Sequence, residues 1–547
     1  MSVSREWMGR GVVLLALAAT VTLPFVLRTE EAPALVADDK VVIITPHNEA
    51  IRSEFARGFA TWYEANQGRT VAVDWRVIGG TSEIARYLDG EYTQAFRLHW
   101  TRDLGRDWNA QVEQSFDKPS VKVDGTPEDD TDAESARRAF LASRVSCGID
   151  VFFGGKSFDF IRQAAEGRIV DSGIFERRPQ WFGPEVFPQE HNGETFWARD
   201  HSWAGAVIAS FGILYNRDAL RRLGIAHEPD QWRDLTDPKF FGELALADPT
   251  KSGSIAKAFE MVLQQEMQIR LRELKETGLP DSEAAPQAVR EGWTRGFQVL
   301  QLMGANARYF TDSSQKPPID IAQGDSAAGM CIDFYGRYQA EAVRRRDDSA
   351  RLEYVTPTAG SVYNVDPIAA LRGAPHPELT LDFIEYVLSP EGQKLWNFKV
   401  GTPGGPTIFA LRRLPVRKDA YVPEFDRFRS DPGVDPYAPE NNFIYHPEWT
   451  GGVFREMSFL IRVLCLDAHA ELVEAWRAII DAGFPTDAMR VLQDMSSIEY
   501  DLTTGLIKSK LRSGNPLDEV KLGRELSNGF RRQYVRAAEI ARAIRAD

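Results

Sequence analysis

The chain has 547 residues and a 43% hydrophobic share, so it exceeds what one hydrophobic core usually supports and at least two packed units are expected. Its formal net charge is -14 and it has no basic cluster, which argues against nucleic acid as the main partner, because phosphate backbones are held by clustered Lys and Arg. Three widely spaced cysteines, Cys147, Cys331 and Cys465, exclude a recognisable zinc or iron–sulfur motif and favour buried free thiols.

An apolar run covers residues 11–27, with Arg5 and Arg10 before it. Its length is borderline for a membrane span, and its flanks also suit a secretion signal, so residues 1–37 are expected to be a signal peptide or a membrane anchor. Positive charge before the run keeps the amino terminus in the cytoplasm. The body of the protein is therefore expected to be periplasmic or extracytoplasmic, held at the inner membrane if the run is not cleaved.

The next segments alternate between strand and helix patterns. Residues 40–45, KVVIIT, form a continuous β-branched stretch that predicts a strand covered on both faces. Residues 48–66 carry apolar side chains at spacings of four, four and three, which predicts a helix, and 70–78 alternate as a second strand. Gly79, Gly80, Thr81 and Ser82 then form a glycine turn whose hydroxyls suit a helix N-cap. This order is typical of an α/β sheet.

The alternation of strand and helix patterns stops between Glu91 and Arg144. An acidic stretch there, PEDDTD, indicates a surface insertion bounded by residues 89–147. The alternation resumes at 148–155, GIDVFFGG, and continues to about Ala370. Residues 411–547 are turn-rich at first and then largely helical in pattern, which predicts a helical C-terminal extension of unassigned role.

Three hydroxyl-rich turns each precede a predicted helix. Helix amino termini present unpaired N–H groups and partial positive charge, so such turns hold anions or polar ligands, although Ser and Thr are also ordinary N-caps. Strand-to-helix turns at the carboxyl ends of strands face one crevice, which makes three of them a candidate site. Its residues are Thr81, Ser82, Ser252, Gly253, Ser254, Ser313 and Ser314.

A further polar group follows residues 324–332, which read as a turn and a short buried strand. At the carboxyl end of this strand lie Asp333 and Tyr335, where open α/β sheets place their ligands. Residues 389–396, SPEGQKLW, read as a helix start.

In this order the segments resemble bacterial extracellular solute-binding proteins of ABC transporters, in particular the ferric-ion-binding periplasmic group. The resemblance covers about residues 41–402 outside the insertion. It is carried by KVVIITPHNE, WRVIGGTSEIARYL, GIDVFFGG, FGILYNRDAL, DPKFFGELALADPTKSGS, GDSAAGMCIDFYGR and SPEGQKLW.

The resemblance implies an α/β, two-lobed periplasmic-binding-protein fold of the type II kind that closes on a ligand by a hinge motion. Residues 38–215 and 356–410 would form lobe 1, with the insertion, and 216–355 would form lobe 2. It further implies delivery of the ligand to an ABC permease in the inner membrane.

In ferric-ion carriers of this group a histidine near the first strand and two adjacent tyrosines bind the metal, beside a small anion at a helix start. His47 matches that histidine, and Phe334-Tyr335 fall where the tyrosine pair would be, so one phenol is missing and Asp333 is a substitute oxygen ligand. Ser252, Gly253 and Ser254 match the anion loop. The resemblance therefore implies a small anionic solute, or ferric ion with a synergistic anion, with His47 and Tyr335 as metal ligands.

Other functions stay open at this stage. GxSxG, HExxH, P-loop and GxGxxG motifs are absent, so no enzyme is expected, although an enzyme on the same fold is one alternative. A membrane-tethered ligand sensor or scaffold is the other, because an uncut anchor and a helical extension would suit one. His47 also fits an ordinary loop histidine, and Tyr335 a half-buried residue with its hydroxyl satisfied locally.

Overall fold

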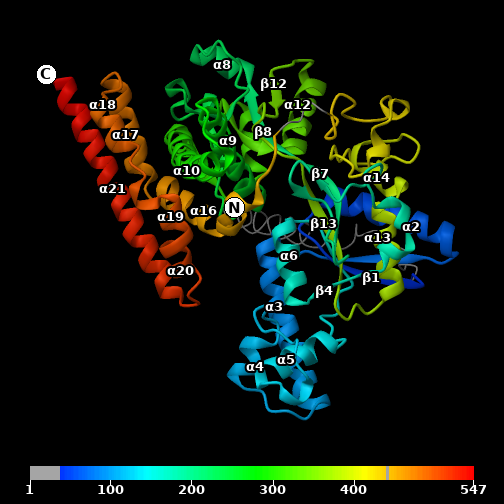
Figure 1. Ribbon diagram of the computed structural model, residues 1–547. Coiled ribbons are helices and arrows are strands. Elements are labelled where there is room, and N and C mark those ends of the chain that lie inside the picture. The colour runs from blue at the N-terminus through cyan, green and yellow to red at the C-terminus, as the bar shows by residue number, and fades with distance from the viewer. Residues whose placement is uncertain (1–36, 439–442, 547) are drawn as a thin grey trace, which may run out of the picture.

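The computed structural model describes residues 37–438 and 443–546, and it contains two mixed β-sheets, each covered by helices (Figure 1). The expected α/β class is confirmed. The apolar run at 11–27 lies outside the described residues. Of the helices that the structure describes, none combines the length and the apolar character needed to cross a membrane.

The first sheet has the strand order β2-β1-β3-β13-β4, and β7 pairs with β13. The predicted β-branched strand is β1, which is buried and parallel to β2 and β3. The strands of this first sheet are β1 (Asp39–Ile44), β2 (Val71–Arg76), β3 (Val151–Phe153), β4 (Ile169–Val170), β7 (Ala204–Ala209) and β13 (Asn364–Leu371). Its helices are α2 (Glu49–Gln67), α3 (Thr81–Leu98), α6 (Ser157–Glu166), α7 (Ile174–Arg177), α13 (Pro377–Leu388) and α14 (Pro390–Asn397).

Two local predictions hold in this unit. Ser389 caps α14 by accepting a hydrogen bond from the N–H of Gly392 at 3.1 Å, so SPEGQKLW is a helix start. The stripe on α2 buries Ile51, Phe55 and Phe59 against the sheet, as the spacing indicated. A small hairpin, β5 (Glu190–His191) and β6 (Glu194–Thr195), also belongs to this unit.

The second sheet has the order β10-β9-β11-β8-β12. It starts at Phe211, the first residue of β8, and not at Asn216 as expected, because β8 pairs with β11 and β12. Its strands are β8 (Phe211–Asn216), β9 (Leu244–Ala247), β10 (Ala307–Thr311), β11 (Ala328–Ile332) and β12 (Leu352–Val355). Its helices are α8 (Arg217–Leu223), α9 (Gly253–Glu276), α10 (Asp281–Asn306), α11 (Lys316–Gln323) and α12 (Asp333–Asp347). The chain passes between the sheets twice, from β7 to β8 and from β12 to β13.

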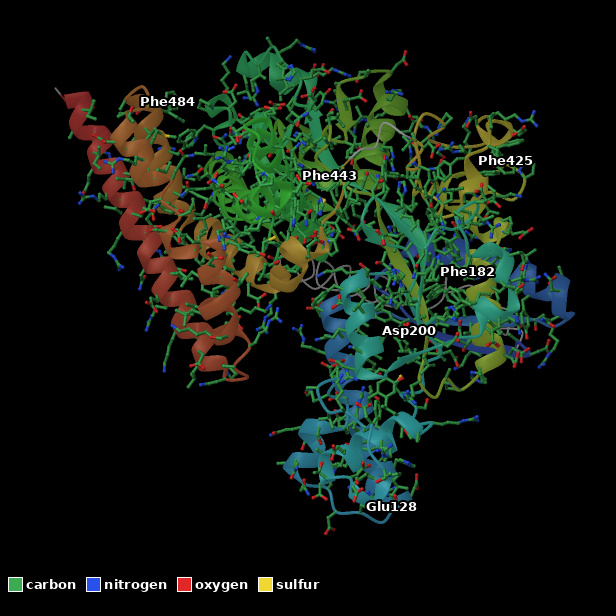
Figure 2. The ribbon with its side chains drawn as sticks, in the orientation of Figure 1. Glu128, Phe182, Asp200, Phe425, Phe443 and Phe484 are labelled. Carbon is green, nitrogen blue, oxygen red and sulfur yellow. The ribbon has the colours of Figure 1, made fainter. Side chains whose placement is uncertain are left out.

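The insertion begins inside α3, which continues to Leu98 and ends in a π-helical turn, and it adds α4 (Ala110–Ser115) and α5 (Asp132–Ala142). The rings of Phe96 and Phe116 stack with centroids 4.9 Å apart, and Phe140 meets both edge-on. These rings extend the hydrophobic core of the first unit into the insertion, and Figure 2 shows Glu128 at the far end of the insertion from the sheets.

The C-terminal extension is part of the second unit. Its first residues pass over the first sheet, where Leu414 accepts a 2.7 Å hydrogen bond from the N–H of Ile208. The helices that follow share one hydrophobic core with α9 and α10, and α17, α18 and α21 line the outer side of the unit (Figure 1). They are α15 (Pro447–Thr450), α16 (Phe454–Ile461), α17 (His469–Asp481), α18 (Thr486–Leu492), α19 (Tyr500–Leu502), α20 (Lys508–Leu511) and α21 (Pro516–Ala546).

Candidate functional site

Six strand-to-helix turns from the two sheets meet at one cavity. In the first sheet β1, β2 and β3 are parallel neighbours, and in the second β9, β10 and β11 are. The carboxyl ends of parallel strands meet at one edge of a sheet, so the helices that follow, α2, α3, α6, α9, α11 and α12, all begin at these edges. The cavity has a volume of about 790 Å³, and each of the six turns contributes to its lining.

Nine of the ten predicted ligand-binding residues line this cavity. The structure brings together His47, Thr81, Ser82, Ser252, Gly253, Ser254, Ser313, Ser314 and Tyr335. Asp333 does not line it, which corrects the expectation that its carboxylate faces the ligand. Asp333 is fully buried at the start of α12, where Arg337 donates to it at 2.5 Å. An arginine one helical turn later thus binds this carboxylate within α12.

The hydroxyl groups of the turns differ in what they already bind. Ser252 caps α9 through a 3.4 Å bond from the N–H of Ile255, and Ser313 accepts from the N–H of Gln315 at 3.3 Å. The expected hydroxyl cap on α3 is wrong, because its N-cap is Gly80 and no side chain caps it. The N-cap of α6 is Lys156, which makes no cap hydrogen bond either. The starts of α3 and α6 therefore present N–H groups to the cavity without a side-chain cap, and the starts of α11 and α12 have no side-chain cap either.

Glycines allow the β3–α6 turn to pass close to its neighbours. Gly154 and Gly155 have φ angles of +88° and +121°, which side-chain-bearing residues rarely adopt. A Cβ at Gly154 would lie 2.3 Å from the His47 ring, and one at Gly155 would lie 2.0 Å from Thr81 Cγ2. The uncapped starts of α3 and α6 are thereby held side by side.

Lys156 extends from this turn to the second unit. A Cβ on Gly253, at the start of α9, would lie 1.0 Å from Lys156 Cε and 2.0 Å from its Nζ. Within the described residues no carboxylate lies at ion-pair distance from this ammonium, although Phe454 lies 5.9 Å from it, ring centroid to Nζ. Burial lowers the pKa of Lys156, and the more distant Asp159 and Glu83 oppose that shift. The Lys156 side chain thus lies at the starts of two helices, α6 and α9.

His47 lies in a cluster with two charged partners. Arg413 Nη1 is 2.7 Å from Asp366 Oδ2 and 3.4 Å from His47 Nε2, and the guanidinium lies 4.6 Å from the centroid of the Phe334 ring. Burial, the largest effect, lowers the pKa of His47. Burial likewise raises the pKa of Tyr335. His47 is therefore a neutral imidazole beside a cation, and Tyr335 a protonated phenol.

The wall formed by α9 contains a buried ion cluster. Lys257 Nζ lies 2.7 Å from Glu194 Oε1, 2.9 Å from Glu260 Oε2 and 3.4 Å from the centroid of the Tyr445 ring. Tyr445 donates to Glu260 Oε1 at 3.0 Å, and its N–H donates to the carbonyl of Asn192 at 2.8 Å. This cluster links the β5–β6 hairpin to α9 and the extension. Lys257 is neutralised there and adds no net positive charge.

Sequence reasoning missed Arg52, Lys156 and Arg413, which all line the cavity. Lys156 directly follows the GG of a predicted strand end, so the turn argument used for Thr81 would have found it. Arg413 lies in the segment expected to be an extension. No local signal marks it, because its place depends on the chain returning to the first sheet. Elsewhere, His227, Asp230 and Asp234 approach one another closely enough to share a metal ion, but they lie outside the cavity lining.

Comparisons with known proteins agree with this architecture. Residues 169–408 match the family model described as "Bacterial extracellular solute-binding protein". The chain is 28% identical over 246 residues to an uncharacterized protein of Haemophilus influenzae, covering 45% of this chain and 60% of that one. It is 26% identical over 189 residues to the phosphoglycerate transport regulatory protein PgtC of Salmonella typhimurium, covering 35% of this chain and 39% of that one.

Neither alignment reaches two thirds of the relative's length. A similar solved structure is iron-bound HitA from Pseudomonas aeruginosa, with a TM-score of 0.45 and 16% identity over 78% of this chain and 99% of that one. The family is one of binding proteins, which agrees with the absence of catalytic motifs from the sequence. Over residues 169–408 the chain is thus similar to the bacterial extracellular solute-binding proteins.

Proposed function

We propose that this protein is the solute-binding component of an ABC-type importer and captures a small anionic solute in the cavity between its two sheets. The observation that carries the proposal is Lys156, a cation without a carboxylate partner among the described residues, at the uncapped start of α6 and against the start of α9. Helix amino termini and a nearby ammonium both stabilise negative charge.

Two further cations of the lining support an anion. Arg52 and Lys251 also line the cavity, and no carboxylate of the described chain pairs with either of them at ion-pair distance. Each helix start favours an anion by about 0.3–1 kcal/mol, so several together with a cation give useful affinity. The relative PgtC is described as a phosphoglycerate transport regulatory protein, which is consistent with an organic anion.

Ferric ion with a synergistic anion is the less supported cargo. The guanidinium of Arg413 beside His47 Nε2 would repel a cation bound there, and a protonated Tyr335 is a poor ligand for ferric ion, which favours anionic oxygen. The roles of His47 and Tyr335 as metal ligands stay a prediction.

The two lobes, one built on each sheet, are proposed to close around the solute, with an ABC permease in the inner membrane as the partner. Three of the six turns follow strands of the first sheet and three follow strands of the second. A ligand that touches the helix starts of both sheets therefore makes its full contacts only when the two lobes are close together. Such differential contact is what drives a hinge to close.

Isothermal titration calorimetry of the protein from Asp38 onward tests the proposal. We expect binding of organic phosphates or carboxylates, and a Lys156→Gln variant that binds the same ligand at least tenfold more weakly. Lys40→Gln is the matched control, because Lys40 is exposed and pairs with Asp74 outside the cavity. No binding of inorganic phosphate, 3-phosphoglycerate, citrate, phenyl phosphate or 3-phenylpropionate would overturn the proposal, and binding of ferric salts without any anion would replace it.

A second candidate is a tethered ligand sensor, which is favoured by the description of PgtC as a regulatory protein. A carrier and a sensor differ in cells that lack this protein. Loss of ligand uptake indicates the carrier, whereas intact uptake with a lost transcriptional response indicates the sensor.

A further inference from the structure

We propose that the solute is an amphiphilic anion, with a charged phosphate, phosphonate or carboxylate head and an apolar body of about the size of a phenyl or hexyl group. This inference rests on the proposed function and names the substrate class of the same site.

The cavity is much larger than an anionic head alone requires. Its volume is about 790 Å³, whereas an inorganic oxyanion has five heavy atoms and, at about 30 Å³ for a water-sized group, would fill about a fifth of it. Volumes of this order are those of sites that enclose small organic molecules. Most of the cavity therefore remains for the body of the ligand.

Large apolar side chains of the first unit line this remaining space and are exposed. Val77 is 47% exposed, Phe158 46% and Ile161 52%. Val77 precedes the Gly79–Thr81 turn, and Phe158 and Ile161 follow Lys156 on α6, so each lies within a few residues of an uncapped helix start. Apolar surface gathered in a cavity beside polar groups is typical of a binding groove for a partly apolar ligand.

The extension supplies the facing wall. Phe454, at the start of α16, stacks on Phe158 with ring centroids 6.1 Å apart and planes 27° apart. The same Phe454 ring lies 5.9 Å from Lys156 Nζ. The cationic end and the apolar end of the cavity are therefore adjacent, and one ligand bridging them needs its charge and its apolar body joined by a short link.

The apolar wall lies outside the segment that matches the family. Val77, Phe158 and Ile161 precede residue 169, and Phe454 follows residue 408. The match to the family therefore gives no information on this wall, and the preference for an apolar body rests on this chain's own side chains.

Calorimetry with ligands matched in their head group tests the inference. We compare phenyl phosphate with glycerol 3-phosphate, and 3-phenylpropionate with glycerate, on the unmodified protein from Asp38 onward. The expected result is that, in the head-group series that binds, the apolar member binds at least tenfold more tightly. A preference for the polar member in that series would overturn the inference while leaving the proposed function intact. Failure of all four ligands and of inorganic phosphate to bind would overturn both.

Substitutions in the cavity wall test which side chains cause the preference for the apolar ligand. Phe158→Ala is expected to weaken the apolar ligand about tenfold and to leave the polar ligand with the same head unchanged, since Phe158 touches only the body of the ligand. Leu98→Ala is the matched control, because Leu98 is also exposed but lies on α3 outside the cavity lining. Equal weakening of both ligands by Phe158→Ala, or equal effects of the two variants, would contradict the assignment.

Discussion

Glu54 illustrates how a single side chain can join parts of the chain that lie far apart in the sequence. It is buried on α2, and its carboxylate accepts hydrogen bonds from the N–H groups of Thr407, Ile408 and Phe409 at 2.7–2.8 Å. Burial alone would raise the pKa of Glu54, but these three N–H groups together hold it below its usual value. The carboxylate therefore stays ionised and anchors the loop before Arg413.

We predict that Glu54→Gln lowers the free energy of unfolding by about 2–4 kcal/mol, since the neutral amide accepts fewer bonds and turns its NH₂ toward N–H donors. Urea unfolding followed by tryptophan fluorescence measures this. Glu64→Gln, at an exposed position of the same helix, is expected to change stability by less than about 0.5 kcal/mol. If the two variants were equally stable, the anchoring role would be refuted.

The same residue marks a limit of sequence reasoning. The apolar stripe on α2 predicted which face is buried, but periodicity could not indicate that a carboxylate at position 54 is buried with it. Its partners lie more than 350 residues away and belong to a loop without a regular pattern. Periodicity detects a buried face, and it does not detect what a polar group on that face binds.

Among elements, α21 departs most from the sequence-based expectation. A terminal helix with a polar composition was expected to be part of an extension of unassigned role, yet Phe530, Tyr534, Ala537 and Ala541 are buried in the core of the second unit. Tyr534 donates to the carbonyl of Leu464 at 2.9 Å and accepts from Gln301 at 3.2 Å. The helix therefore completes a core and is not an appendage.

We predict that Tyr534→Ala lowers the free energy of unfolding by about 3–5 kcal/mol, because it leaves a large cavity and removes two buried hydrogen bonds. The neighbouring Val535 is 47% exposed, so Val535→Ala is expected to have an effect of less than about 0.5 kcal/mol. Guanidinium unfolding of both variants makes the comparison. A small effect of Tyr534→Ala would mean that α21 is dispensable for the second unit.

At the scale of the whole molecule, local patterns predicted the parts better than their assembly. Strand and turn signals identified strands such as β1, β2 and β11 and eight of the cavity-lining residues, since helix starts at strand ends are determined by nearby residues, and the family resemblance added His47. The charges that complete the cavity, Lys156 and Arg413, and the apolar wall at Phe454 were not foreseen. They come together only through the two crossings between sheets and the return of the extension, and sequence periodicity carries no information about such long-range contacts.

One buried histidine, His47, and two partly buried ones, His191 and His469, give the whole molecule a predictable pH dependence. Burial lowers the pKa of His47, His191 and His469. Each is neutral in the folded protein, whereas in the unfolded chain each takes up a proton below about pH 6.5. Below that pH the unfolded state binds more protons than the folded state. The contribution of these histidines to the free energy of unfolding is therefore complete above that pH, and below it the free energy of unfolding falls by up to about 1.4 kcal/mol per pH unit for each histidine.

We predict that His469→Gln makes this fall less steep, because glutamine can still donate to the carbonyl of Gly304 but does not titrate. His191→Gln should act likewise, and the two effects should add, since the residues lie in different units. Urea unfolding at pH 7.5, 6.5 and 5.5 provides the slopes. Subtracting the slope of the unmodified protein from that of the variant cancels the contributions of other titrating groups. Glu194 is one of them: burial raises its pKa, so it contributes to the slope with the opposite sign. A variant slope equal to or steeper than the parent's would show that the imidazole is protonated in the folded state.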